Sequence, residues 1–405
     1  MHNQNTAKHI FCCWELGGEL GHLVRLANIT RVLEQRSYRV SIAVKDVSQA
    51  IRVLGDTQAT LLQAPVWLPT ITLNRPIACM ADTLMLKGYL EPDGLQGLYR
   101  AWYNLTSWAQ PDLILYDYSP TALLANHQRG IPAIGVGTGF IDPVPGHPIA
   151  DWRQGTANDD LIARQEARVL STINEVCTRE RRPPISRLSD IYATSRYVIT
   201  TYPALDIYQA TRSQALYRPF NNNSAQRVPV RFPEGTGPKI IAYLKPKFPH
   251  LDVLLKALSK TRARVFIACP GGQAAQFQPY ASDHLTFSTE MVELEHGIAA
   301  ADLFMGHGNM SSVTQSLQAG TPTAIIPIQM EQLLTGQQVQ KAGAGILINN
   351  IKSVEHLTDI LNEAARSQSL KEAAQQFQRD NLTLLQQDLA ETVADLCDEL
   401  LGTHS

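Results

Sequence analysis

Residues 300–332 form a strand–turn–helix–turn–strand pattern, which restricts the fold of this chain more than any other stretch. An apolar run from Leu303 to Met305 stops at Gly306, and a helix is predicted to begin near Ser311. The turn between them, residues 307–312, would present backbone N–H groups and two hydroxyls at the positive end of that helix. The sequence therefore predicts an anion-binding turn in an α/β fold, although the glycine and serines could also serve only to turn the chain and cap the helix.

A second unit of this kind opens the chain. His9 to Trp14 reads as an apolar strand, a glycine-rich turn follows, and apolar residues from Leu23 to Leu33 repeat at helical spacing before a strand at residues 38–44. This pattern places His22 at the N-terminal end of a helix, beside the carboxyl end of the first strand. Open α/β sheets bind ligands at that edge.

A third strand, residues 111–117, delivers Asp117 to its carboxyl end, just before a helix that is predicted to start near Pro120. His22 and Asp117 are therefore expected at the same edge of one parallel sheet, on strands that could be neighbours. Two further strands of this sheet are predicted at residues 131–136 and 197–201.

The length of 405 residues favours two domains. We predict an α/β chain with an N-terminal domain at 1–218, a linker rich in Pro, Asn and Gly at 219–238, and a C-terminal domain at 239–385. Residues 386–405 are predicted to form a helix that returns to the N-terminal domain. The strands expected in the second domain are residues 240–244, 264–268, 284–287, 303–305, 323–327 and 345–348, followed by helices at 354–365 and 371–401.

Residues 60–110 interrupt the α/β pattern with many aromatic and turn residues. A long excursion between two strands often forms the wall of a pocket, whereas aromatic residues are also common core fillers. Both interpretations of this segment stay open at the level of sequence.

Charge and cysteine content exclude several classes of protein. The formal net charge of −2 gives no electrostatic reason to expect nucleic acid or an anionic membrane as a partner. The six cysteines show no metal-binding spacing and are expected to be buried thiols in a reducing compartment. Because no signal peptide and no apolar run of about 18 residues is visible, a soluble cytoplasmic protein without a membrane span is expected. The oligomeric state stays open.

The strand predicted after the anion turn ends close to Glu331 and Gln332. A carboxylate beside an amide suits the hydroxyls of a sugar, which need both hydrogen-bond acceptors and donors. The anion turn and these two residues together make the stretch 300–345 resemble the nucleotide-sugar signature of the family 1 (UDP-glycosyltransferase-like) enzymes of GT-B fold. The matching positions are His307, Gly308, Ser311, Ser312, Ser316, Leu317, Gly320, Pro322, Pro327, Glu331 and Gln332.

The resemblance implies the GT-B fold, in which two Rossmann-like doubly wound domains face a cleft. It implies that Glu331 and Gln332 bind the donor sugar. It also implies a diphosphate site, to which Lys245 in the first turn of the second domain could contribute, although a loop lysine is more often only solvated. The residues predicted to hold the diphosphate are His307, Gly308, Asn309, Met310, Ser311, Ser312 and Lys245.

The chain departs from the family signature in three places. Asn309 replaces the second glycine, which is tolerable because Asn accepts unusual backbone angles. Gln315 stands where the family usually has a ribose-binding glutamate. Met291 and Val292 open the stretch where many relatives carry W-x-P-Q for stacking on the base. We therefore expect Met291, Val292 and Gln315 to bind the nucleoside, with the identity of the base open.

In the N-terminal half, Gly21 and His22 match the position where the family places its catalytic base, and Asp117 matches the aspartate that orients it. A neutral imidazole can take the proton of an acceptor hydroxyl, while a carboxylate on its other nitrogen fixes the tautomer. The alternatives are a histidine that only packs and an aspartate that only caps a helix.

The resemblance predicts an inverting glycosyltransferase that moves a hexose or deoxyhexose from a UDP- or dTDP-sugar to a hydroxyl acceptor, small or lipid-like, without metal or other cofactor. The Gly21, His22 and Arg25 pattern also resembles nucleotide-sugar hydrolases and transferases that use a lipid-linked acceptor, so these activities are alternatives. From another class, a non-catalytic protein that binds nucleotide sugars stays open.

Overall fold

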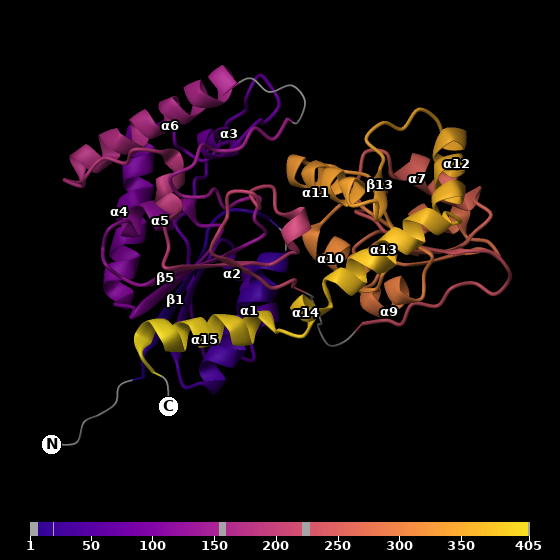
Figure 1. The fold of residues 1–405 in the computed structure, drawn as a ribbon, viewed down its shortest axis with the longest axis horizontal. Coiled ribbons are helices and arrows are strands. Elements are labelled where there is room, and N and C mark those ends of the chain that lie inside the picture. Colours follow the sequence, from indigo (N-terminus) through magenta and orange to yellow (C-terminus); the bar gives the residue numbers. More distant parts are fainter. Residues whose placement is uncertain (1–6, 19, 154–158, 221–226, 404–405) are drawn as a thin grey trace. The chain divides into compact units, whose positions relative to one another are not determined.

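The computed structural model describes residues 7–18, 20–153, 159–220 and 227–403. The chain divides into two compact units (Figure 1): unit 1 comprises residues 1–220 and 387–405, and unit 2 comprises residues 221–386. Part of the predicted linker, residues 221–226, lies outside the described residues.

Unit 1 is built on a seven-stranded parallel sheet of order β3-β2-β1-β4-β5-β6-β7. Its strands are β1 His9–Trp14, β2 Arg39–Val44, β3 Thr60–Gln63, β4 Leu113–Asp117, β5 Ala133–Gly137, β6 Arg196–Ile199 and β7 Ala215–Tyr217. Its helices are α1 Leu20–Gln35, α2 Val47–Leu54, α3 Met80–Met85, α4 Pro92–Ala109, α5 Pro120–Asn126, α6 Asp159–Arg179 and α15 Leu389–Leu401, with 3-10 turns at Leu188–Tyr192 and Pro203–Leu205.

Helix α1 lies against the sheet through the face that the sequence pattern predicted. Leu23, Leu26 and Leu33 are fully buried and pack in one core cluster with residues of β1 and β2. Residues three, four and seven positions apart share one face of a helix, so this burial fixes which way α1 is turned.

The strand order of unit 1 reverses between β1 and β4, because the chain runs outward from β1 to β3 and then returns to pair β4 with β1. In this pairing Trp14 lies opposite Asp117. The prediction that Asp117 and the turn leading to His22 share one edge on adjacent strands is therefore confirmed. This edge is the topological switch point, where open α/β sheets bind their ligands.

Unit 2 has a six-stranded parallel sheet of order β10-β9-β8-β11-β12-β13. Its strands are β8 Lys239–Tyr243, β9 Arg264–Ala268, β10 Leu285–Ser288, β11 Leu303–Gly306, β12 Thr323–Ile325 and β13 Gly345–Leu347. Its helices are α7 Leu251–Ser259, α8 Ala274–Phe277, α9 Leu294–Ala299, α10 Met310–Gln318, α11 Met330–Lys341, α12 Val354–Ala364, α13 Gln368–Asp380 and α14 Leu382–Leu385, with a 3-10 turn at Gln278–Tyr280. All six strands predicted in this half are present.

The excursion at residues 60–110 contains β3, α3 and α4, of which β3 extends the parallel sheet beside β2. Tyr89, Tyr99 and Trp102 are buried, whereas Trp108 is largely exposed. Tyr89 and Trp102 therefore fill the interior of unit 1, as the packing interpretation of the segment proposed, whereas Tyr99, although buried, also lines a small pocket beside Cys177 and Arg182.

The segment predicted as the linker, residues 219–238, differs from that expectation in its second half. Val228 pairs with Val292 in an isolated parallel bridge. Val230 and Phe232 pack against a core cluster of unit 2. The density of Pro, Asn and Gly suggested a free connection, but the alternating apolar side chains hold this segment on unit 2.

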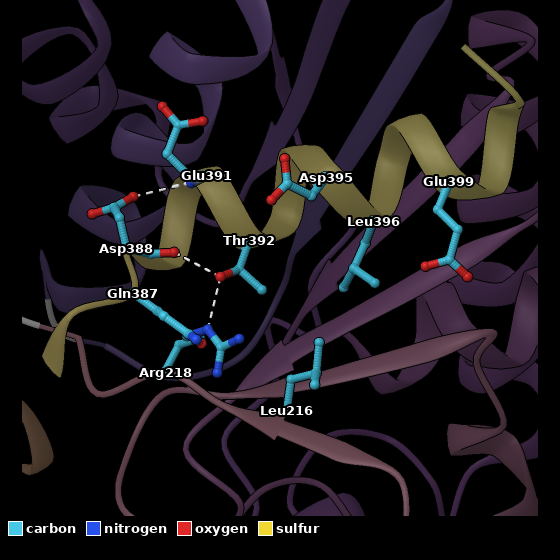
Figure 2. A pocket seen from close by; sticks show the side chains of 9 residues that line it. All are labelled: Leu216, Arg218, Gln387, Asp388, Glu391, Thr392, Asp395, Leu396 and Glu399. Atoms are coloured by element: carbon cyan, nitrogen blue, oxygen red, sulfur yellow. Dashed lines mark hydrogen bonds between the residues drawn. The ribbon is translucent and has the colours of Figure 1, made fainter. Parts of the chain in front are cut away.

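The prediction of one long helix at residues 371–401 is wrong. The structure has three helices there, α13, α14 and α15, because Asn381 ends α13 and Asp388 begins α15. The Asp388 side chain accepts a hydrogen bond from the N–H group of Ala390 at 2.8 Å and one from that of Glu391 at 3.0 Å, the second of which is drawn in Figure 2. Such an N-cap supplies hydrogen-bond acceptors to the first N–H groups of a helix, which have no partner within the helix. In a continuous helix these N–H groups would already be bonded to the preceding turn.

Helix α15 lies in unit 1, on the side of the sheet that α1 covers (Figure 1). Leu389, Val393 and Cys397 are buried in the same core cluster as α1. Arg36, in the turn directly after α1, binds acidic residues of α15, among them Asp398 at 2.6 Å. Apolar burial and these charges together attach the last helix of the chain to unit 1.

All six cysteines are buried and unpaired, as predicted. No helix among the described residues is both long enough and apolar enough to cross a membrane.

Candidate active site

His22 lies in the first turn of α1, where the glycine-rich turn after β1 leads into the helix. Its Nδ1 atom is 2.7 Å from Oδ1 of Asp117, the last residue of β4. Both residues belong to unit 1. The pair that the resemblance to the family implied is thus brought into hydrogen-bond contact by the pairing of β1 with β4.

The Asp117 carboxylate is fully buried, and its second partner is Arg25. Arg25 Nη2 donates to both carboxylate oxygens at 2.6 and 2.7 Å, and Nε donates to Oδ2 at 3.0 Å. Burial alone would raise the pKa of Asp117, but the charges of Arg25 and His22 and their hydrogen bonds outweigh it and hold the pKa below its usual value. Asp117 is therefore ionised at neutral pH.

Nδ1 of His22 lies 2.7 Å from the Asp117 carboxylate and 3.1 Å from Nη2 of Arg25. Because the ionised carboxylate can only accept hydrogen bonds, the shorter contact places a proton on Nδ1. The neutral ring is then protonated at Nδ1, and its lone pair lies on Nε2. His22 thus has the tautomer that a general base requires.

Arg25 is a residue that reasoning from sequence did not assign to the site. It lies three positions after His22, and this helical spacing places both side chains on one face of α1. A buried arginine on the sheet side of an amphipathic helix requires a carboxylate partner. This need for a partner, together with Asp117 at the end of the neighbouring strand, could have indicated from the sequence that Arg25 belongs to the site.

Aromatic rings flank His22. The Trp14 ring lies 5.5 Å from the imidazole at an angle of 17°, and the Tyr118 ring lies 6.1 Å away at 30°. Tyr118 has a φ of 47°, which is uncommon for a bulky residue. Such backbone strain occurs at sites where the surrounding structure fixes a particular geometry.

Gly17, in the turn before α1, packs directly on His22. A Cβ atom placed on Gly17 would lie 2.5 Å from Nε2 of His22, and φ of Gly17 is 82°. Only glycine fits this position, because a side chain would be strained and would collide with the nitrogen that carries the lone pair. The Lys45 side chain donates a hydrogen bond to the Gly17 carbonyl oxygen.

The predicted anion turn lies in unit 2, between β11 and α10. The strand order of unit 2 reverses between β8 and β11, so this turn is at the topological switch point of its sheet. Helix α10 begins at Met310, and no side-chain hydrogen bond caps it. Its first turn, which contains Ser311 and Ser312, therefore keeps the character of a positive helix terminus.

His307 is buried in this turn, and both of its ring nitrogens have partners within unit 2. Nδ1 donates to the Ile326 carbonyl at 3.0 Å, and Nε2 accepts from the backbone N–H of Lys245 at 3.1 Å. His307 thus connects the ends of β8 and β11 as a neutral ring. Its predicted contact with a diphosphate would have to replace the one with the Lys245 N–H.

Gly308 has a φ of 87°, and a Cβ placed on it would lie 2.9 Å from the Gln332 carbonyl oxygen. This glycine therefore allows the backbone at residue 308 to lie close to the backbone of α11. Gln332 itself is buried: its Oε1 accepts from Ile328 N–H at 2.8 Å, and its Nε2 donates to Asn309 Oδ1 at 2.5 Å. Gln332, predicted to bind the donor sugar, fixes the anion turn in this structure, while Glu331 lies partly exposed in the first turn of α11.

The three predicted nucleoside residues have different surroundings. Gln315 lies in α10 with a buried Oε1 that has no hydrogen-bond partner among the residues that the structure describes. Met291 is substantially exposed. Val292 is a core residue packed with Phe304, so its side chain does not face a ligand. The stretch at 291–292 differs from expectation because its β-bridge turns Val292 inward.

A cavity of about 510 Å³ lies between β7 and α15 in unit 1 (Figure 2), and it contains none of the predicted site residues. Its acidic side chains already have partners: Asp388 caps α15, Glu391 pairs with Arg36, and Glu399 pairs with Arg196. No histidine is among its lining residues.

Comparisons with known proteins agree with these observations. Residues 253–391 match the glycosyltransferase family 28 C-terminal domain. The chain is 23% identical over 385 residues to NDP-glycosyltransferase YjiC of Bacillus licheniformis, covering 89% of this chain and 87% of that protein. Two shorter matches, each 32% identical, span only 21% and 20% of the lengths of two glycosyltransferases of Bacillus subtilis.

Solved structures share the whole fold. The calicheamicin glycosyltransferase CalG4 aligns with a TM-score of 0.75 at 16% identity, over 98% of this chain and 99% of that one. The glycosyltransferase VinC, solved in complex with DTDP, aligns with a TM-score of 0.65 at 15% identity, over 98% and 100%.

The two parallel-sheet units and the solved structures show that the chain has the GT-B fold, and its C-terminal half is similar to a domain of glycosyltransferases. Within that class it is similar to family 1, the UDP-glycosyltransferase-like group, as the signature at residues 300–345 predicted.

Proposed function

We propose that this protein is an inverting glycosyltransferase that moves a hexose or deoxyhexose from a UDP- or dTDP-sugar to the hydroxyl of an acceptor. One observation carries the proposal: Asp117 binds Nδ1 of His22 at 2.7 Å, which leaves the lone pair of this ring on Nε2. A histidine held in this way is suited to act as a general base.

In the proposed reaction, Nε2 of His22 takes the proton of the acceptor hydroxyl while its oxygen attacks the anomeric carbon. The bond from that carbon to the diphosphate oxygen breaks in the same step, and the nucleoside diphosphate leaves with the electron pair. A single displacement inverts the anomeric configuration. Asp117 stabilises the imidazolium that forms, and Arg25 holds Asp117 ionised and in place.

We assign the donor to unit 2. The first turn of α10, with Ser311 and Ser312, is the type of helix terminus that binds phosphate and stabilises a leaving diphosphate. The unpartnered Oε1 of Gln315 supports a hydroxyl donor such as a ribose nearby, because a buried acceptor without a partner is costly. VinC, a protein of the same fold, was solved with DTDP, which supports a nucleoside diphosphate for this chain.

The test compares His22→Ala with the wild-type protein. We expect the variant to lose transfer by at least a thousandfold and to bind UDP or dTDP unchanged in calorimetry. NMR of the product should show an anomeric configuration opposite to that of the donor. Equal loss of donor affinity in the variant, or a retained configuration, would contradict the proposal.

The hydrolase and lipid-linked alternatives depended on Arg25, and its guanidinium is bound to Asp117. That contact gives Arg25 a role in holding Asp117, a role that is compatible with water, a lipid-linked acceptor or another hydroxyl acceptor. Incubation with donor alone separates these cases, since rapid release of free sugar would indicate a hydrolase. A protein that turns over no donor with any acceptor would be a binding protein.

We propose that transfer needs no metal or other cofactor and takes place in the cytoplasm. The helix terminus would supply the electrostatic stabilisation that a cation supplies elsewhere. Transfer measured with and without EDTA checks the first point, because a metal-dependent enzyme would lose its activity.

A further inference from the structure

Unit 1 contains three lysines, and two of them lie near the turn that covers His22. Lys8 pairs with Asp112 at 2.9 Å on an exposed surface. Lys45 and Lys87 are partly buried, and neither makes an ion pair within the described part of the chain. Unlike Lys8, Lys45 and Lys87 therefore carry positive charges that no ion pair in the described part of the chain neutralises.

Lys45 follows β2, next to β1, at the sheet edge where β1 ends. Its ammonium group donates to the carbonyl oxygen of Gly17. Gly17 in turn packs against Nε2 of His22, because a Cβ on it would lie 2.5 Å from that atom. One residue thus separates Lys45 from the nitrogen that is proposed to deprotonate the acceptor.

Lys87 follows α3, in a turn that packing holds in place. Its backbone N–H donates to the Leu84 carbonyl at 2.8 Å. The next residue, Gly88, has a φ of 89° and lies against the Trp67 ring, with a hypothetical Cβ 2.5 Å from Cε3. The backbone at Lys87 is therefore held in place by the fold.

The two lysines repel each other. Burial lowers the pKa of Lys45, the charge of Lys87 lowers it further, and Asp46 only partly opposes them. The Asp46 carboxylate is itself exposed and accepts hydrogen bonds from the N–H and hydroxyl of Ser48, as the N-cap of α2. Two partly desolvated cations without a carboxylate partner cost free energy, which a bound anion would offset.

We propose that Lys45 and Lys87 bind an anionic group, a carboxylate or phosphate, on the acceptor whose hydroxyl is presented to His22. This inference depends on the proposed transferase function and adds the chemical class of the acceptor. Lys45 binds with the N–H donors that Gly17 does not use, and Lys87 supplies the second charge. Acceptors without an anionic group bind more weakly to the same site.

The test uses two acceptors of nearly equal size, 4-hydroxybenzoate and its neutral amide, 4-hydroxybenzamide. Wild-type protein should show a KM about tenfold lower for the carboxylate. Lys87→Met should raise that KM towards the value for the amide and should change the KM of the amide much less. Lys87→Glu should reverse the preference. Lys352→Met, at an exposed lysine of unit 2, is the matched control.

A binding measurement keeps the inference separate from catalysis. Calorimetry with benzoate and with phenyl phosphate, in the absence of donor, should show binding that Lys87→Met weakens about tenfold, and the two probes distinguish a carboxylate from a phosphate site. Such binding would support the site even if no sugar transfer occurred. Equal KM values for both acceptors, or binding that is absent or unaffected by the substitution, would overturn it.

Discussion

The α-carbon of Gly17 lies against the imidazole of His22, so closely that a Cβ on Gly17 would be 2.5 Å from Nε2 and 3.0 Å from Cδ2. The turn after β1 therefore closes over the proposed base with no space for a side chain. The same turn positions the ring that Asp117 orients from the opposite nitrogen.

We expect Gly17→Ala to reduce kcat at least a hundredfold, because the new methyl group must displace the His22 ring and the residue would be strained at a φ of 82°. Binding of UDP or dTDP should be unchanged in calorimetry. Gly18→Ala is the control, since a Cβ there meets no atom within 4 Å. Two variants with equal activity would show that the contact is not important for catalysis.

We expect Arg25→Met to lower the free energy of unfolding by about 3–5 kcal/mol, because it leaves the fully buried Asp117 charge without its arginine. Arg31→Met on the same helix breaks a partly exposed pair with Asp56 and should cost no more than about 1 kcal/mol. Urea denaturation measures both. If the Asp117 pair is the cause, the double variant Arg25→Met/Asp117→Leu should be more stable than Arg25→Met alone.

We expect Gln332→Glu to weaken the binding of nucleoside diphosphate about tenfold. The substitution puts a carboxylate oxygen against Asn309 Oδ1, where Nε2 now donates at 2.5 Å, and so shifts the start of α10. Calorimetry with UDP or dTDP measures the change. Gln340→Glu, exposed on the same helix α11, adds the same charge and should leave affinity unchanged.

The Glu15 carboxyl group should make stability depend on pH. It is buried at the start of α5, and burial raises its pKa from 4.5 to about 7, against the hydrogen bonds from Thr121 and Ala122. The folded protein then binds this proton more tightly than the unfolded chain does. Its contribution to stability is therefore complete below about pH 4.5 and is lost as pH rises through about 7, by up to roughly 3 kcal/mol.

Unfolding measured between pH 4.5 and 7.5 for Glu15→Gln should show a smaller decrease with pH than the wild-type protein. Glu363→Gln, at an exposed position, should keep the wild-type slope. Parallel curves for all three proteins would contradict the assignment of this proton to Glu15.

Features encoded by local pattern could be predicted from the sequence. The apolar runs ending at Trp14 and Asp117 predicted two strands, and the doubly wound arrangement made them neighbours, so the contact of His22 with Asp117 followed from topology. Other parts depend on where side chains meet. Val230 looked like part of a loop rich in Pro and Gly, and only the apolar surface of unit 2 shows why it is held there.

The same limit applies to the candidate site. Gln332 matched a position for sugar binding, but its amide is bound by Asn309 and Ile328, two partners that its place in the sequence does not indicate. Arg25 was visible three residues after His22, yet its role depends on the full burial of Asp117. Motifs indicated which residue types gather at the two switch points. Packing determined which of these residues hold other site residues in place.

Helix α15 completes the core of unit 1, although all of unit 2 precedes it in the sequence. On the ribosome, the face of α1 that Val393 and Cys397 cover must therefore stay uncovered until residues 389–401 have been synthesised. Unit 2 is a continuous segment and can fold earlier. Premature termination just before residue 387 would yield a chain whose second half is complete and whose first half exposes an apolar surface to chaperones and proteases.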